Sequence, residues 1–63
     1  MSDNVIDVTW DLLRPGVTAR RYDGTFDRAI EIERQAFSVS VLFADGHRER
    51  HQPAEPTQVI VRR

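Results

Sequence analysis

Apolar and polar residues alternate along several short segments of the chain, which is the pattern of strands that bury one face. The clearest is the segment 37–44, in which every odd-numbered residue is phenylalanine or valine. Three other segments, 5–10, 17–22 and 57–61, are rich in β-branched or aromatic residues. Because such side chains pack well on a pleated sheet, these segments are also predicted to be strands.

Two Asp-Gly pairs, Asp23-Gly24 and Asp45-Gly46, each follow a predicted strand. Glycine tolerates positive φ, and Asp-Gly is frequent in the type I′ turns of two-residue hairpins. The pairs therefore predict antiparallel hairpins with type I′ turns. The segment 47–52 after the second pair is polar throughout, so we expect an exposed strand at an edge of the sheet.

The segment 25–35 allows two interpretations. At a period of 2, Phe26, Ile30 and Ile32 share one face of a strand whose other face is largely polar. At a period of 3.6, Phe26, Ala29 and Ile30 share one stripe of a helix. The turn directly before this segment favours the strand. The predicted fold is therefore all-β, a small antiparallel barrel of about five or six strands, with an α+β fold that has a helix at 25–35 as the alternative.

Composition narrows the class of protein. A chain of 63 residues is expected to form a single domain, residues 1–63, and domains of this size are often supported by disulfides, metals or partner chains. The chain has no cysteine, which excludes disulfides and thiolate zinc sites and leaves self-association as one form of support. It has no apolar run near the about 20 residues that cross a bilayer and no signal-peptide pattern, so we expect a cytoplasmic protein without a membrane partner.

The order of residues around the two Asp-Gly pairs is similar to that of the Tudor family of SH3-like barrels. The matching residues are Gly16-x-x-Ala19-Arg20-x-x-Asp23-Gly24-x-Phe26-x-Arg28-Ala29, followed by Val41-x-Phe43-x-Asp45-Gly46. They cover about half of the chain. The resemblance implies a five-stranded barrel that binds a ligand and is not an enzyme.

Members of this family often bind methylated lysine or arginine in an aromatic cage, whose ring faces attract the cation. In this chain Phe43 stands at a matching aromatic position, with Tyr22 and Phe26 as near neighbours. Arg21 and Asp27 stand at two positions where the family often has aromatic residues.

The remaining aromatic residues and the histidines predict no catalytic or metal centre. Aromatic residues supply much of the buried area of a small core, so we assign Trp10, Phe26, Phe37 and Phe43 to the core. Tyr22 lies beside a turn and is the best candidate for an exposed aromatic residue.

Two histidines, His47 and His51, lie four residues apart. On a strand they would be about 13 Å apart, too far to bind one ion, so we interpret both as solvated surface residues. The chain has no nucleophile motif and no glycine-rich phosphate loop, and we expect no cofactor.

All nine basic residues are arginine, and several of them occur in pairs, at 20–21, 48/50 and 62–63. The first two pairs could form a phosphate-binding patch, which makes nucleic acid an alternative partner. The net charge of −1 supplies no field that would steer the chain towards nucleic acid, and acidic residues on neighbouring segments favour a surface of mixed charge.

We therefore expect a non-catalytic binding module whose partner is another protein, in an accessory or inhibitory role. The expected contact surface is the edge strand 47–52 or a patch around Tyr22. The candidate partner-binding residues are Arg20, Arg21, Tyr22, Asp27, Phe43, His47, Arg48 and Arg50. A homo-oligomer is possible, and a further alternative is an oligomeric enzyme with a pocket at a symmetric interface.

Overall fold

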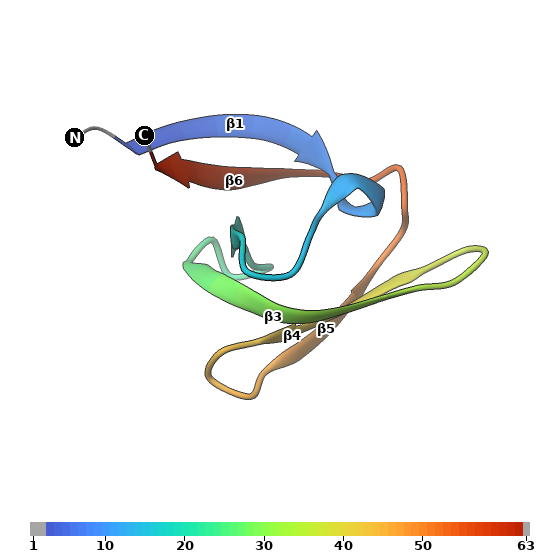
Figure 1. Cartoon of the computed structure of the whole chain (residues 1–63). Coiled ribbons are helices and arrows are strands. Elements are labelled where there is room, and N and C mark those ends of the chain that lie inside the picture. Colours follow the sequence, from blue (N-terminus) through green and yellow to red (C-terminus); the bar gives the residue numbers. More distant parts are fainter. Residues whose placement is uncertain (1–2, 63) are drawn as a thin grey trace.

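The computed structural model describes residues 3–62, which form six antiparallel strands in one sheet (Figure 1). The strands are β1 (Asp3–Thr9), β2 (Thr18–Arg20), β3 (Phe26–Arg34), β4 (Val39–Phe43), β5 (Arg48–His51) and β6 (Pro56–Arg62). A single 3-10 turn, η1 (Trp10–Leu12), follows β1. The order across the sheet is β1-β6-β2-β3-β4-β5, so β1 and β5 are the two end strands. The predicted domain also includes residues 1, 2 and 63, which lie outside the described part.

The all-β prediction is confirmed, and the alternative prediction of a helix at 25–35 is wrong. Strand β3 occupies most of that segment and pairs with β2 on one side and with β4 on the other. The edge position of the segment after the second Asp-Gly pair is also confirmed, because β5 pairs with β4 alone within residues 3–62. No helix in the described residues is long and apolar enough to span a bilayer.

A β-bulge in β3 corrects the predicted apolar face of this strand. Ala29 pairs with Phe43, whereas Glu31 pairs with Leu42, so Ile30 is an extra residue in the register with β4. One extra residue moves every later side chain to the opposite face. Ala29 is therefore buried before the bulge and Ile32 packs against the core after it, while Ile30 is 45% exposed. The single face proposed for Phe26, Ile30 and Ile32 is wrong.

The two Asp-Gly pairs form hairpins as predicted, but the prediction that their turns are of type I′ is wrong. No described residue other than glycine has a positive φ, so Asp23 and Asp45 cannot occupy type I′ positions. In the first turn the Gly24 N–H donates to Arg21 O, and the Arg21 N–H donates to Thr25 O. The second turn repeats this pattern with Phe43, Gly46 and His47. Each loop has three residues and ends on a positive-φ glycine that forms a bulge.

The core lies between β2 and β6 on one side and β3 and β4 on the other. Its buried apolar residues are Trp10, Leu13, Ala19, Ala29, Val39, Val41, Phe43 and Val59. The core positions of Trp10 and Phe43 are confirmed, and those of Phe26 and Phe37 are wrong. Phe37 is 90% exposed because it lies in the tip between β3 and β4, before the alternation of β4 begins at Val39.

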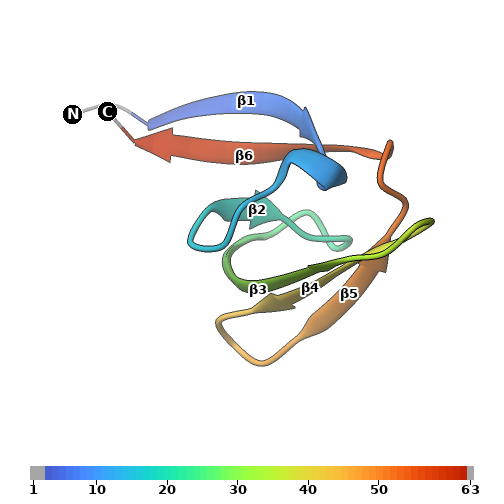
Figure 2. The same cartoon turned by 45° about the vertical axis from the view of Figure 1, so that its right-hand side comes forward.

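Strands β1 and β6 form a long two-stranded ribbon, paired from Asp3↔Arg62 to Thr9↔Pro56. Strand β2 pairs with β6 only at Ile60 and Val59. Figures 1 and 2 show that the part of the ribbon near the chain ends extends beyond β2. In this outer part of the ribbon, β1 and β6 are therefore paired with each other and have no third strand beside them.

Candidate functional site

His51 lies in the middle of an aromatic stack. Its ring stacks on Trp10 with centroids 3.7 Å apart and on Tyr22 with centroids 4.3 Å apart. The His51 side chain is only 2% exposed. The prediction of a solvated surface histidine is therefore wrong at this position. The reason is that β5 turns alternate residues inward, so Glu49 and His51 are buried although the strand lies at an edge.

Two carboxylates hold the His51 ring in this stack. Its Nε2 lies 2.8 Å from Glu49 Oε1, and its Nδ1 lies 2.8 Å from Glu55 Oε2. Both ring nitrogens therefore lie within hydrogen-bond distance of a carboxylate, and these contacts fix the orientation of the ring. Burial, followed by the nearby charges of Glu55 and Glu49, raises the pKa of the Tyr22 hydroxyl, which donates to Arg50 O.

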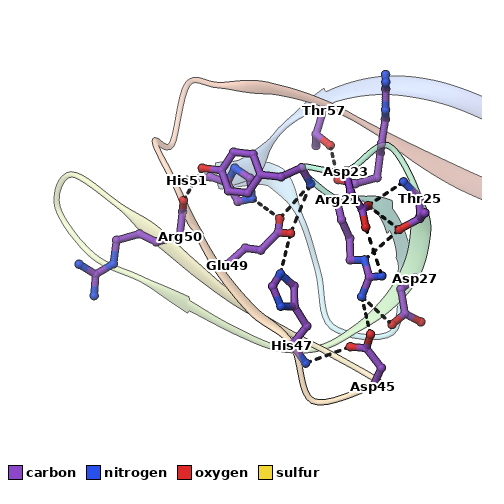
Figure 3. A network of polar contacts seen from close by, with 12 residues as sticks. Arg21, Asp23, Thr25, Asp27, Asp45, His47, Glu49, Arg50, His51 and Thr57 are labelled. Carbon is purple, nitrogen blue, oxygen red and sulfur yellow. Dashed lines mark hydrogen bonds and ion pairs between the residues drawn. The ribbon is translucent and has the colours of Figure 1, made fainter.

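Glu49 is the buried centre of this polar cluster. Its carboxylate also accepts the Tyr22 backbone N–H at 3.3 Å and lies 3.0 Å from His47 Nε2 (Figure 3). Its side chain is 4% exposed, whereas that of His47 is 52% exposed. Three groups from two separate segments thus converge on one buried carboxylate, which fixes the turn after β2 against β5.

Arg21 joins the two Asp-Gly turns through a second polar cluster (Figure 3). Its guanidinium lies 2.6 Å from Asp45, 3.6 Å from Asp27 and 3.8 Å from Asp23. The same group lies over the ring of Phe43, with Cζ 5.6 Å from the ring centroid. The cation that meets this ring is therefore the chain's own arginine, and the ring itself is buried.

The hydrogen bonds of the two turns shift the pKa values of their charged groups. A hydrogen bond from Arg21 and then the His47 backbone N–H lower the pKa of the Asp45 carboxyl. Hydrogen bonds from the Thr25 hydroxyl and N–H lower the pKa of Asp23. The bond to Asp45 also raises the pKa of Arg21. Each of these shifts favours the charged forms that make the contacts.

We expect these aspartates to make the fold sensitive to acid. A carboxyl whose folded pKa lies below its unfolded value of about 4 stabilises the fold above that pH, and this stability is lost as the pH falls through the folded pKa. The urea midpoint of the wild type should therefore decrease below about pH 4. In Asp45→Asn the same decrease should be smaller, and an equal decrease in both proteins would contradict the role of Asp45.

The structure divides the predicted partner-binding residues into two groups. Arg21, Asp27, Phe43, His47 and the backbone of Tyr22 take part in the internal clusters described above. Arg20, Arg48 and Arg50 remain exposed, and Tyr22 is 67% exposed although its ring stacks on His51. Arg20 and Tyr22 border one hollow of about 370 Å³, which the carboxylates of Asp7 and Glu55 also line.

A larger apolar groove lies elsewhere, between the β1–β6 ribbon and the turn that precedes β2, and sequence reasoning missed it. Its volume is about 620 Å³, and it is lined by Ile6, Val8, Leu12, Leu13, Arg14, Gly16, Val17, Thr18, Arg28, Val59, Ile60 and Val61. The apolar pair Leu12-Leu13, which Arg14 alone separates from Pro15-Gly16, was the available signal. Leu13 is buried, whereas Leu12 is 66% exposed at the groove.

Comparisons of the chain with protein-family models, with curated proteins and with solved structures found no match. The functional argument therefore depends on the geometry of the groove and of the polar clusters.

Proposed function

We propose that this chain is a non-catalytic binding module that takes an apolar segment of another protein into the groove. The observation that carries the proposal is the groove itself, whose walls are mainly aliphatic and include two partly exposed residues, Ile6 and Leu12. Concave apolar surfaces with a few polar groups are the usual form of binding sites. Leu12, at 66% exposure, is an aliphatic side chain that a partner could cover.

Two arginines give the groove a charge preference. Arg14 and Arg28 both line it, and neither has an acidic partner within 4 Å among the described residues. The Arg28 guanidinium lies near Gly16, and Arg14 directly precedes Pro15, so both arginines border the Pro15-Gly16 turn. A bound segment would therefore carry apolar side chains next to a carboxylate, which a guanidinium can bind in a bidentate geometry.

The polar clusters support a binding role over a catalytic one. His51 and Glu49 are buried, and their hydrogen-bonding atoms face each other or other groups of the chain. The guanidinium of Arg21 is likewise surrounded by three aspartates. These side chains stabilise the fold, so they offer little capacity for proton transfer to a bound substrate.

We also propose that the bent sheet is a small barrel of the SH3-like class, as the resemblance to the Tudor family implies. Two contacts bring the segment after β1 to the other end of the sheet order: the Trp10 ring stacks on His51 of β5 with centroids 3.7 Å apart, and the Asp11 N–H donates to Pro53 O. These contacts join the turn after β1 to β5 and to the loop that follows it. They support a closed arrangement in which side chains and loop contacts complete the barrel.

Leu12→Asp tests the groove. This change should abolish capture of the partner from an extract of the source cells, because it would place a carboxylate in a groove whose lining also includes Ile6 and Val8. Phe37→Asp is the matched control, because Phe37 is more exposed than Leu12 and does not line the groove. It should leave capture unchanged.

A second pair of variants tests the charge preference. Arg28→Glu should weaken capture, whereas Arg48→Glu, an exposed arginine away from the groove, should not. Equal capture by the wild type, Leu12→Asp and Arg28→Glu would contradict the proposal. Recovery of a bound lipid with the purified chain, in place of a protein, would contradict it as well.

A further inference from the structure

The outer edge of β1 is the longest free strand edge in the described part of the chain. β1 has seven residues and pairs with β6 alone, whereas β5, the other end strand, has four. The ribbon of β1 and β6 extends beyond β2 (Figure 2). A two-stranded ribbon is marginally stable in water, and at least one more strand is needed for independent stability. Val5 and Ile6 are 53% and 44% exposed on this ribbon.

We propose that β1 pairs with β1 of a second copy of this chain, in antiparallel orientation and centred on Ile6. In such a pair a two-fold axis sets one residue opposite its own copy. With Ile6 at the centre, Val5 faces Asp7 of the second copy and Asn4 faces Val8. No two like charges are then directly opposite, and the isoleucines meet at the axis.

The neighbouring registers are disfavoured by charge. A register centred on Val5 sets Asp3 opposite Asp7, and one centred on Asp7 sets that residue opposite itself. Like charges directly opposite each other destabilise a strand pair. The sequence of β1 therefore permits one symmetric register and disfavours those on either side of it.

The other end strand, β5, is protected against the same pairing. A register centred on Glu49 sets two carboxylates opposite each other, and one centred on Arg50 sets two guanidinium groups opposite each other. β5 is also short, and the carbonyl of Arg50 accepts a hydrogen bond from the Tyr22 hydroxyl at 2.8 Å. Charge and short length are the usual means by which edges avoid pairing, and β1 is longer than β5 and carries charge only at Asp3 and Asp7.

The pairing extends the sheet through β6, β1 and the same two strands of the second copy. The symmetry axis is perpendicular to the sheet, so the faces that carry Ile6 and Val8 lie on the same side in both copies. These residues line the groove, and the two grooves would meet at the axis. This inference goes beyond the proposed function, since it concerns a second copy and the edge of β1.

Sedimentation of the purified chain over a wide range of concentration tests the pairing. The wild type should form dimers, and Ile6→Lys should weaken the dimer by about tenfold or more, because two ammonium groups would face each other at the axis. Val5→Lys is the matched control. Its ammonium group would face Asp7 of the second copy, so the dimer should persist. An equal mixture of Ile6→Lys and Ile6→Glu should restore dimers that neither variant forms alone.

A cysteine at the axis gives an independent test, because the chain has no cysteine of its own. Facing residues in an antiparallel pair have Cα atoms about 4.5–5.5 Å apart, which is within disulfide range. Ile6→Cys should therefore form an intermolecular disulfide readily, and Val5→Cys, which is offset from its own copy, should not. A wild type that stays monomeric at every concentration, or equal cross-linking of the two cysteine variants, would overturn the proposal.

Discussion

Replacement of Glu49 by alanine is expected to destabilise the fold by about 3–5 kcal/mol, because it leaves several groups of a buried polar cluster without their acceptor, at about 1–3 kcal/mol each. The Tyr22 N–H and His47 Nε2 lose an acceptor, and His51 keeps only the contact to Glu55. A chain of 63 residues has a total stability of about 3–9 kcal/mol at the usual values per residue. The variant should therefore lose about a third or more of the total stability, and its urea midpoint should lie far below that of the wild type.

Two further variants make this result interpretable. Glu33→Ala removes an exposed carboxylate that accepts only the Gln35 side-chain amide among the described residues, and it should change stability by less than about 0.5 kcal/mol. Glu49→Gln keeps the volume and one acceptor oxygen, so its urea midpoint should lie between those of the wild type and Glu49→Ala. Equal stability of the two alanine variants would show that the buried cluster does not support the fold.

Phe43→Ala should cost about 3–5 kcal/mol, as truncation of a fully buried phenylalanine does in other cores. Phe43 has no exposed surface, and it also supports the guanidinium of Arg21. Phe37→Ala makes the same chemical change at a residue that is 90% exposed and should cost less than about 0.5 kcal/mol. Urea unfolding of both variants measures the difference.

Phe43→Leu keeps the test informative if Phe43→Ala does not fold. Its midpoint should decrease in the same direction by a smaller amount, because most of the core volume is retained. A loss at Phe37 equal to that at Phe43 would place the tip between β3 and β4 inside the core and contradict the structure.

The sequence predicted the strands well where one face alternates without interruption. Val39, Val41 and Phe43 are buried in β4 as the alternation requires. The prediction of the buried face of β3 failed because a single extra residue, Ile30, moves the later side chains to the opposite face. The alternation of apolar and polar residues does not reveal such a bulge. It failed at Phe37 because hydrophobicity alone does not distinguish the first residue of a strand from the last residue of a turn.

The polar clusters were less predictable than the strands. Segment 47–52 is polar, which predicts exposure. His51 and Glu49 are hydrogen-bonded to each other, however, and polar groups that are paired in this way can be buried together. Their partners, Tyr22 and Trp10, come from distant parts of the chain. The sequence named Arg21 and Asp27 as candidate binding residues. Arg21 pairs with Asp27 within the first hairpin, but its pairing with Asp45 depends on two turns that meet only in the folded chain.

The grouping of several aspartates around Arg21 also affects how this chain can change in evolution. Loss of one aspartate leaves the guanidinium with two others, since Asp23, Asp27 and Asp45 all lie within 4 Å. Loss of the arginine leaves neighbouring carboxylates without a counter-charge. In diverging descendants the acidic positions should therefore vary one at a time, while arginine at position 21 should be retained.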